Sequence, residues 1–207
     1  MKKLIIIIAV CISNIQAQNL IVSEQFSACS LPEKWSLETA AGPYSFAVIK
    51  SNLMPQADAT CTIVYQQTDK NNTTFRKFSI STKAFPLFKY SNYKLDFGLR
   101  FVRAGAPNQL KLYSLLDGTK TLIQTYSNDV VQNGLVLVNQ SLDLQIPPNA
   151  QTIQFIFEYE SNGNDVNTIL LIDNLYLNGP DNDDCSRAVE ITLDAPCLSG
   201  NIIWFWR

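Results

Sequence analysis

Apolar and polar residues alternate along much of the chain between residues 20 and 178. The alternation is clearest in residues 93–101 and 153–159, where Phe, Tyr, Leu and Ile occupy every second position. A period of two places successive side chains on opposite faces of a β-strand. Both segments are therefore predicted as strands with one buried and one solvated face, and no stretch of helical period competes with them.

Shorter alternating runs and regularly spaced turn signals complete this pattern. Residues 110–112 and 142–146 predict two further strands. Residues 169–177 are apolar on both faces apart from Asp173 and Asn174, and this pattern predicts a strand in the middle of a sheet. Turn sequences lie between the runs: Ala106-Pro107-Asn108, Asp117-Gly118, Asn133-Gly134, Pro147-Pro148-Asn149 and Ser161-Asn162-Gly163-Asn164. Short strands at this spacing predict an all-β fold in which two antiparallel sheets pack as a sandwich.

The first 17 residues have the anatomy of a secretory signal peptide. Lys2 and Lys3 precede the apolar run 4–12, and a polar stretch ends at Ala17, after which we expect cleavage. The apolar run is about half the roughly 20 residues that a membrane-spanning helix needs, and no later run is long enough. We therefore expect an exported protein, secreted or at the cell surface, with no transmembrane segment after cleavage.

A change of composition near Gly179-Pro180 predicts a domain boundary. We expect the β-sandwich to occupy residues 18–178, which are enough for one domain with a substantial core. Residues 179–207 are expected to be a linker and the fragment of a second, truncated module. The basis for truncation is the aromatic run 202–206, because the chain ends before any sequence that could cover it.

The charge of the chain argues against nucleic acid as a partner. Loss of Lys2 and Lys3 with the signal changes the formal net charge from -2 to about -4. Affinity for phosphate backbones comes from clustered Lys and Arg, whereas the remaining basic residues are scattered along the chain in no run longer than Arg76-Lys77.

Four cysteines remain after cleavage and allow three disulfide pairings. Their positions favour Cys29 with Cys61 and Cys185 with Cys197, because each pair lies within one local region of the sequence. A zinc site is the alternative, but the chain has no C-x-x-C spacing and no histidine.

The absence of histidine also removes the Ser and Cys triads that depend on it. Glu158 and Glu160 remain as a candidate catalytic pair, because they share one face of a strand at a separation that glycoside hydrolases use. We favour the simpler interpretation, in which both are solvated opposite Phe155 and Phe157. The sequence therefore predicts that the protein is not an enzyme.

Two groups of aromatic residues are candidates for stacking on a sugar ring. For Trp35, the neighbouring Leu31 and Leu37 favour a place in the core instead. The second group is more typical of a covered sheet edge than of a cleft and consists of Phe85, Phe88, Tyr90 and Tyr93.

Short motifs give the chain a family resemblance. The segments 24–26 (Glu-Gln-Phe) and 31–35 (Leu-Pro-Glu-Lys-Trp) look like the opening of the jelly-roll modules of secreted bacterial adhesins, of the cleaved-adhesin or choice-of-anchor type and MAM-like in architecture. The segments 95–97 and 171–175 agree with a middle and a closing strand, so the resemblance spans about residues 20–178. Residues 183–185 also resemble the start of a second such module. The resemblance implies a jelly roll that binds a ligand or spaces other domains.

The resemblance also implies a calcium site between the first and last strands. Asp173 lies in the I-D-N of the closing strand and fits that pattern. Ser27 stands where an acidic residue would follow Phe26, which leaves Glu24 as a substitute ligand. Asp181, Asp183 and Asp184 could form a second calcium site, although a solvated linker is the simpler interpretation of these three.

From these observations we expect an exported, non-catalytic module for adhesion or ligand binding, with a surface glycan or a protein as its partner. A structural spacer in a larger secreted protein is the alternative. A glycoside hydrolase that uses Glu158 and Glu160 is a distant third.

Overall fold

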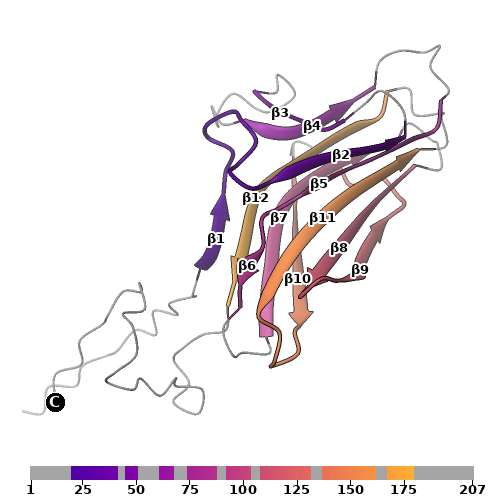
Figure 1. Ribbon diagram of the computed structural model, residues 1–207. Helices are drawn as coiled ribbons and strands as arrows, with labels where there is room; N and C mark the ends of the chain where they lie inside the picture. Colours follow the sequence, from indigo (N-terminus) through magenta and orange to yellow (C-terminus); the bar gives the residue numbers. More distant parts are fainter. Residues whose placement is uncertain are drawn as a thin grey trace, which may run out of the picture. The chain divides into compact units, whose positions relative to one another are not determined.

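The computed structural model describes residues 20–41, 45–50, 61–67, 74–87, 92–103, 108–131, 137–161 and 167–179 (Figure 1). Every regular element in these ranges is a β-strand. Among these residues, none belongs to a helix with the length and apolarity to cross a membrane. The predicted signal peptide, the acidic run and the cysteines of the C-terminal segment, and Phe88 and Tyr90 lie outside the described residues.

The strands form two antiparallel sheets of six strands each, which we name sheet A and sheet B (Figure 1). In sheet A the order is β10 (Val138–Gln145), β7 (Asn92–Val102), β12 (Ile169–Asn178), β4 (Thr62–Gln66) and β3 (Ala47–Ile49), with β1 (Leu20–Glu24) also paired to β12. In sheet B the order is β2 (Ser36–Ala41), β5 (Arg76–Ser81), β11 (Thr152–Ser161), β8 (Gln109–Leu116) and β9 (Thr119–Tyr126), with β6 (Phe85–Pro86) also paired to β11. The predicted all-β, jelly-roll-like sandwich is confirmed.

The core lies between the two sheets and is built from the alternating residues that the sequence identified. From β7 it takes Phe97, whose ring meets Phe157 of β11 edge-on at a centroid distance of 5.3 Å. Phe101 of β7 and Tyr159 of β11 make a second contact of this kind, at 6.3 Å. These rings are buried together with the other inward residues of the two strands: Tyr93, Leu95, Leu99, Ile153 and Phe155.

Strand β12 is central, as its apolar sequence predicts, because it pairs with β7 along one side and with β4 and β1 along the other. Its register with β7 shifts between Asp173 and Tyr176, where Asn174 has a φ of 52°. Asparagine tolerates this left-handed conformation better than most residues, and the extra residue forms a β-bulge. The bulge allows Leu175 to enter the core after Ile172.

The predicted turn Asp117-Gly118 joins β8 and β9 as a two-residue hairpin. Both residues have positive φ, 45° and 89°, which matches the right-handed twist of a hairpin. The Asp117 carboxylate accepts hydrogen bonds from the backbone amides of Gln151 and Thr152, and these bonds hold its pKa below the usual value. These hydrogen bonds hold the β8–β9 turn against the start of β11.

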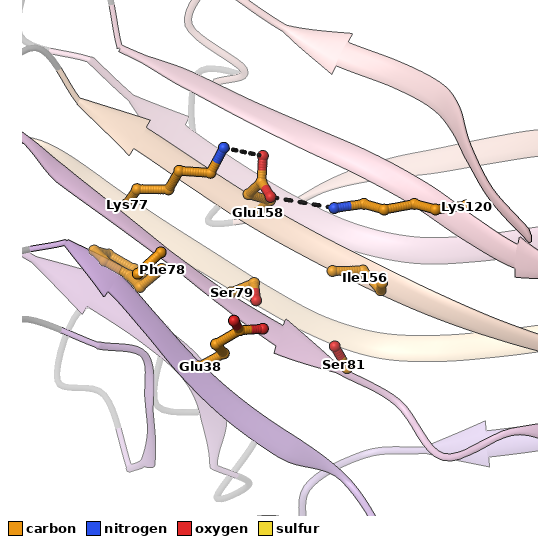
Figure 2. A pocket seen from close by; sticks show the side chains of 9 residues that line it. Glu38, Lys77, Phe78, Ser79, Ser81, Lys120, Ile156 and Glu158 are labelled. Atoms are coloured by element: carbon orange, nitrogen blue, oxygen red, sulfur yellow. Dashed lines mark hydrogen bonds and ion pairs between the residues drawn. The ribbon is translucent and has the colours of Figure 1, made fainter. Parts of the chain in front are cut away.

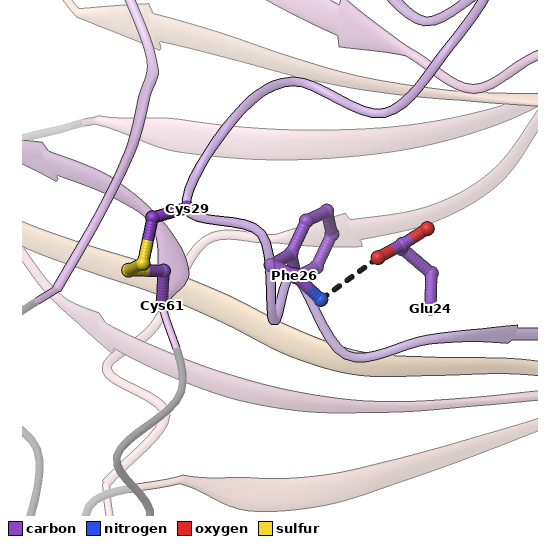
Figure 3. The surroundings of a disulfide bond; sticks show 4 residues. All are labelled: Glu24, Phe26, Cys29 and Cys61. Carbon is purple, nitrogen blue, oxygen red and sulfur yellow. Dashed lines mark hydrogen bonds between the residues drawn. A yellow bond between two sulfur atoms is a disulfide. The ribbon is translucent and has the colours of Figure 1, made fainter.

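The segment between β1 and β2 is tied to the sandwich by a disulfide between Cys29 and Cys61 (Figure 3). The two Cα atoms are 5.0 Å apart, and Cys61 is fully buried directly before β4. Trp35 of the same segment is buried with its ring edge-on to Phe26, at a centroid distance of 5.5 Å. The first predicted pairing and the core role of Trp35 are therefore confirmed.

Candidate functional site

The outer face of sheet B carries an apolar row that crosses three neighbouring strands. Tyr113 of β8 lies directly opposite Ile156 of β11 on one side and Leu122 of β9 on the other. Ile156 and Tyr113 are partly buried, while Leu122 is 50% exposed. Since neighbouring strands are about 4.8 Å apart, the row extends for about 10 Å across the sheet.

A charged row runs beside the apolar one and is centred on Glu158 of β11. One carboxylate oxygen of Glu158 lies 3.2 Å from the ammonium of Lys77 on β5, and the other lies 3.3 Å from that of Lys120 on β9. The hydroxyl of Tyr113 donates to the same carboxylate at 3.3 Å. Figure 2 shows Glu158 between the two lysines. This carboxylate therefore links side chains from four strands of sheet B.

These contacts correct one expectation about the two glutamates. Glu158 was expected to be solvated, but it is 8% exposed, because Lys77, Lys120 and Tyr113 surround it. Glu160, the next outward residue of β11, is more exposed and pairs with Lys111 at 3.1 Å and with Lys77 at 3.7 Å. The sequence placed both glutamates on the right face but could not show their partners.

The environment of Glu158 is unsuited to the acid role in glycoside hydrolysis. Burial raises the pKa of Glu158, but hydrogen bonds and charge from Lys77 and Lys120 outweigh burial and hold that pKa below its ordinary value. A catalytic acid needs the opposite shift, so that it still carries a proton near neutral pH. The arrangement favours a fixed anion that accepts hydrogen bonds.

Lys120 also covers the aromatic ring of the apolar row. Its ammonium lies 4.0 Å from the centroid of the Tyr113 ring, a distance typical of a cation–π contact. Burial and the negative charge of Glu158 raise the pKa of the Tyr113 hydroxyl, so the tyrosine is neutral at physiological pH. Tyr113 therefore offers a hydroxyl to Glu158 and a ring face to Lys120.

A pocket of about 170 Å³ opens beside this cluster on the outer face of sheet B (Figure 2). Glu38 of β2 and Glu158 bring two carboxylates to its lining, and Lys77 and Lys120 bring two ammonium groups. Ser79, Ser81 and Ile156 also line the pocket. The pocket thus combines hydrogen-bond donors and acceptors without excess charge, next to an apolar row.

Known proteins match this chain in structure but not in sequence. No family model matches the sequence, and no curated protein matches it. Among solved structures, the K1 cleaved adhesin domain of Lys-gingipain from Porphyromonas gingivalis W83 matches with a TM-score of 0.52 and 11% identity, over 77% of this chain and 98% of that domain. In fold, the chain resembles a cleaved adhesin domain.

Two further structures support this result. The K3 cleaved adhesin domain of the same gingipain matches with a TM-score of 0.50 and 11% identity, over 79% of this chain and 99% of that domain. The carbohydrate-binding module TmCBM61, solved with β-1,4-galactotriose, matches with a TM-score of 0.50 and 15% identity, over 74% of this chain and 93% of that module. At these identities the likeness concerns the fold alone, and it confirms the predicted resemblance at that level.

The two residues predicted to bind calcium lie on neighbouring strands of sheet A. Glu24, at the end of β1, is opposite Leu175 of β12, two residues beyond Asp173. The Glu24 carboxylate accepts a hydrogen bond from the backbone amide of Phe26 at 2.8 Å (Figure 3), and the Asp173 carboxylate accepts one from that of Asn174 at 2.7 Å. Both donor residues, Phe26 and Asn174, have positive φ. Within the part of the chain that the structure describes, no cluster of three or more acidic, Cys or His residues forms a metal site. Calcium binding here stays a prediction.

Thermal melts test this prediction directly. If calcium bridges β1 and β12, the melting temperature should rise with calcium relative to chelator, and Asp173→Asn should abolish the rise, because it removes a charged ligand. Melts of the unsubstituted protein that coincide with calcium and with chelator would contradict it. Asp173 would then be a structural residue at the β-bulge.

Several residues of the site on sheet B were not singled out from the sequence. Tyr113 lies directly after the short alternating run 110–112, within β8. Lys120 belongs to a largely exposed strand, and Ile156 belongs to a long buried strand. Only the register of β11, β8 and β9 brings them together. The one available signal was Ile156, an apolar residue at a position of β11 that the alternation assigns to solvent.

Proposed function

We propose that the protein is an exported, non-catalytic β-sandwich module that binds an uncharged glycan on the outer face of sheet B. The observation that carries the proposal is the row Ile156–Tyr113–Leu122 with the Glu158–Lys77 ion pair beside it. Sugar rings have apolar faces that pack on aromatic and aliphatic side chains, and hydroxyl edges that need both donors and acceptors. This surface offers both, and TmCBM61, which has a similar fold, was solved with an oligosaccharide.

Export is supported by two independent features. The first 17 residues have signal anatomy, and the Cys29–Cys61 disulfide suits an oxidising compartment outside the cytoplasm. The similar folds include adhesin domains of a gingipain. A role in adhesion at or outside the cell surface fits these features, with a structural spacer as the alternative.

Calorimetric titration with neutral oligosaccharides, β-1,4-galactotriose among them, tests the glycan proposal. We expect measurable binding that does not weaken as salt is added, and a loss of about tenfold or more in affinity for Tyr113→Ala, which is about 1.4 kcal/mol. No salt-dependent loss is expected because the ligand carries no charge to be screened.

Tyr176→Ala is the matched control. Tyr176 is also a partly buried tyrosine of a sheet, but it belongs to β12 of sheet A, where its hydroxyl accepts from Gln25 at 2.9 Å. Its removal should leave the affinity unchanged. If no oligosaccharide binds, the spacer function is favoured, and if both alanine variants bind normally, the glycan site lies elsewhere on the protein.

A further inference from the structure

We propose that Lys120 occupies the sugar-stacking position of the site in the free protein, so that it competes with the glycan and lowers its affinity. This inference rests on the proposed function, because it concerns the same surface. It assigns to Lys120 the role of an internal competitor rather than that of a ligand-binding group.

The Tyr113 ring is oriented by its hydroxyl. This hydroxyl donates to Glu158 on the neighbouring strand β11, at 3.3 Å. The ring is therefore directed across the outer face of sheet B toward β11. A sugar ring would stack on a face of this aromatic ring.

The Lys120 ammonium lies against this ring. It lies 4.0 Å from the centroid of the Tyr113 ring, and it comes from β9, whose outward side chains lie on the solvent side of sheet B. A glycan and this ammonium therefore cannot occupy the ring face together. The ammonium must move before the ring can bind a sugar.

An ion pair holds Lys120 in this position. Its ammonium also pairs with Glu158 at 3.3 Å, so the same carboxylate orients both the ring and the cation that covers it. The Lys120 side chain is 42% exposed, so it is free to swing into solvent once displaced. The contact is thus strong enough to be populated and weak enough to be displaced by a ligand.

Titration of Lys120→Ala with β-1,4-galactotriose and other neutral oligosaccharides tests the competition. Since an exposed cation–π contact contributes about 0.5–1 kcal/mol, affinity should rise by about two- to fivefold over the unsubstituted protein. Lys120→Arg, which keeps a cation over the ring, should not show this rise. Lys83→Ala is the matched control. The Lys83 ammonium lies 5.8 Å from the ring centroid of Phe85, which is buried, and Lys83 does not line the pocket, so its removal should change nothing.

A spectroscopic measurement makes the test independent of affinity. In the free protein the ε-methylene protons of Lys120 should show the upfield ring-current shift of a group above an aromatic ring, and Tyr113→Leu should remove it. Saturation with the oligosaccharide should also remove it. Absence of the shift in the free protein would overturn the inference without any glycan.

The remaining outcomes separate this inference from the proposed function. Weaker or equal binding by Lys120→Ala, or binding that leaves the ring-current shift in place, would overturn the competition while glycan binding stands. If neither the unsubstituted protein nor Lys120→Ala binds any oligosaccharide, the proposed function fails and the inference fails with it.

Discussion

Phe97→Asp should leave the β-sandwich unfolded at room temperature. The Phe97 side chain is 2% exposed and contacts Phe157 and Tyr126 across the core. Loss of a buried aromatic ring costs about 3–5 kcal/mol, and a buried carboxylate without a partner adds several more. Together they approach the 5–15 kcal/mol that is typical of the whole stability of a domain. The β-type circular dichroism spectrum and the cooperative melt should both disappear.

Lys94→Gln provides the control for this substitution. Lys94 lies on the same strand β7 but is exposed, so its replacement should change the melting temperature little. If Phe97→Asp melted like the unsubstituted protein, the assignment of inward and outward faces along β7 would be wrong.

The long central strands could be predicted because their burial is visible in the sequence. Residues 93–101 alternate throughout, and residues 153–159 alternate with Ile156 as the exception, which is enough to fix each strand and its inward face. The two-sided apolar run of β12 marks a strand with neighbours on both sides. The Asp117-Gly118 turn could also be predicted, because few residue pairs accept positive φ at two successive positions.

The edge strands were harder to predict. Nearly every residue of β2 is exposed, and only the last residue of β9 is buried, so neither strand shows an apolar period. Strand β9 nevertheless supplies Lys120 and Leu122, and β2 supplies Glu38 to the pocket. The sequence therefore did not predict the candidate site, because part of it lies on edge strands of sheet B that show no alternation of apolar and polar residues.

The chemistry of the site depends on the register between paired strands, which cannot be predicted from the sequence pattern. Glu158 and Glu160 were recognisable as a pair two residues apart. Their partners, Lys77 and Lys111, come from strands far away in the chain, and a shift of one residue would place either lysine in the core. The same pairings that turn a candidate acid into a paired anion also create the apolar row beside it.

Removal of the Cys29–Cys61 disulfide should lower the free energy of unfolding by about 3–4 kcal/mol. This is the loop-closure entropy expected for a crosslink between residues 32 positions apart. The double variant Cys29→Ala/Cys61→Ala avoids placing a polar group at Cys61, which is fully buried in the core. Chemical denaturation of this variant beside the oxidised unsubstituted protein gives the difference directly.

The same disulfide closes a segment with unusual backbone conformations. Phe26, Cys29 and Lys34 all have positive φ without being glycine, which costs free energy in a short stretch of chain. The crosslink and the packing of Trp35 against Phe26 hold this stretch in place, so reduction should expose Trp35 and change its fluorescence before the sandwich unfolds. Peptide mapping under non-reducing conditions supplies the control for the pairing itself. A peptide joining Cys29 to Cys185 would contradict both this disulfide and the predicted boundary near residue 178.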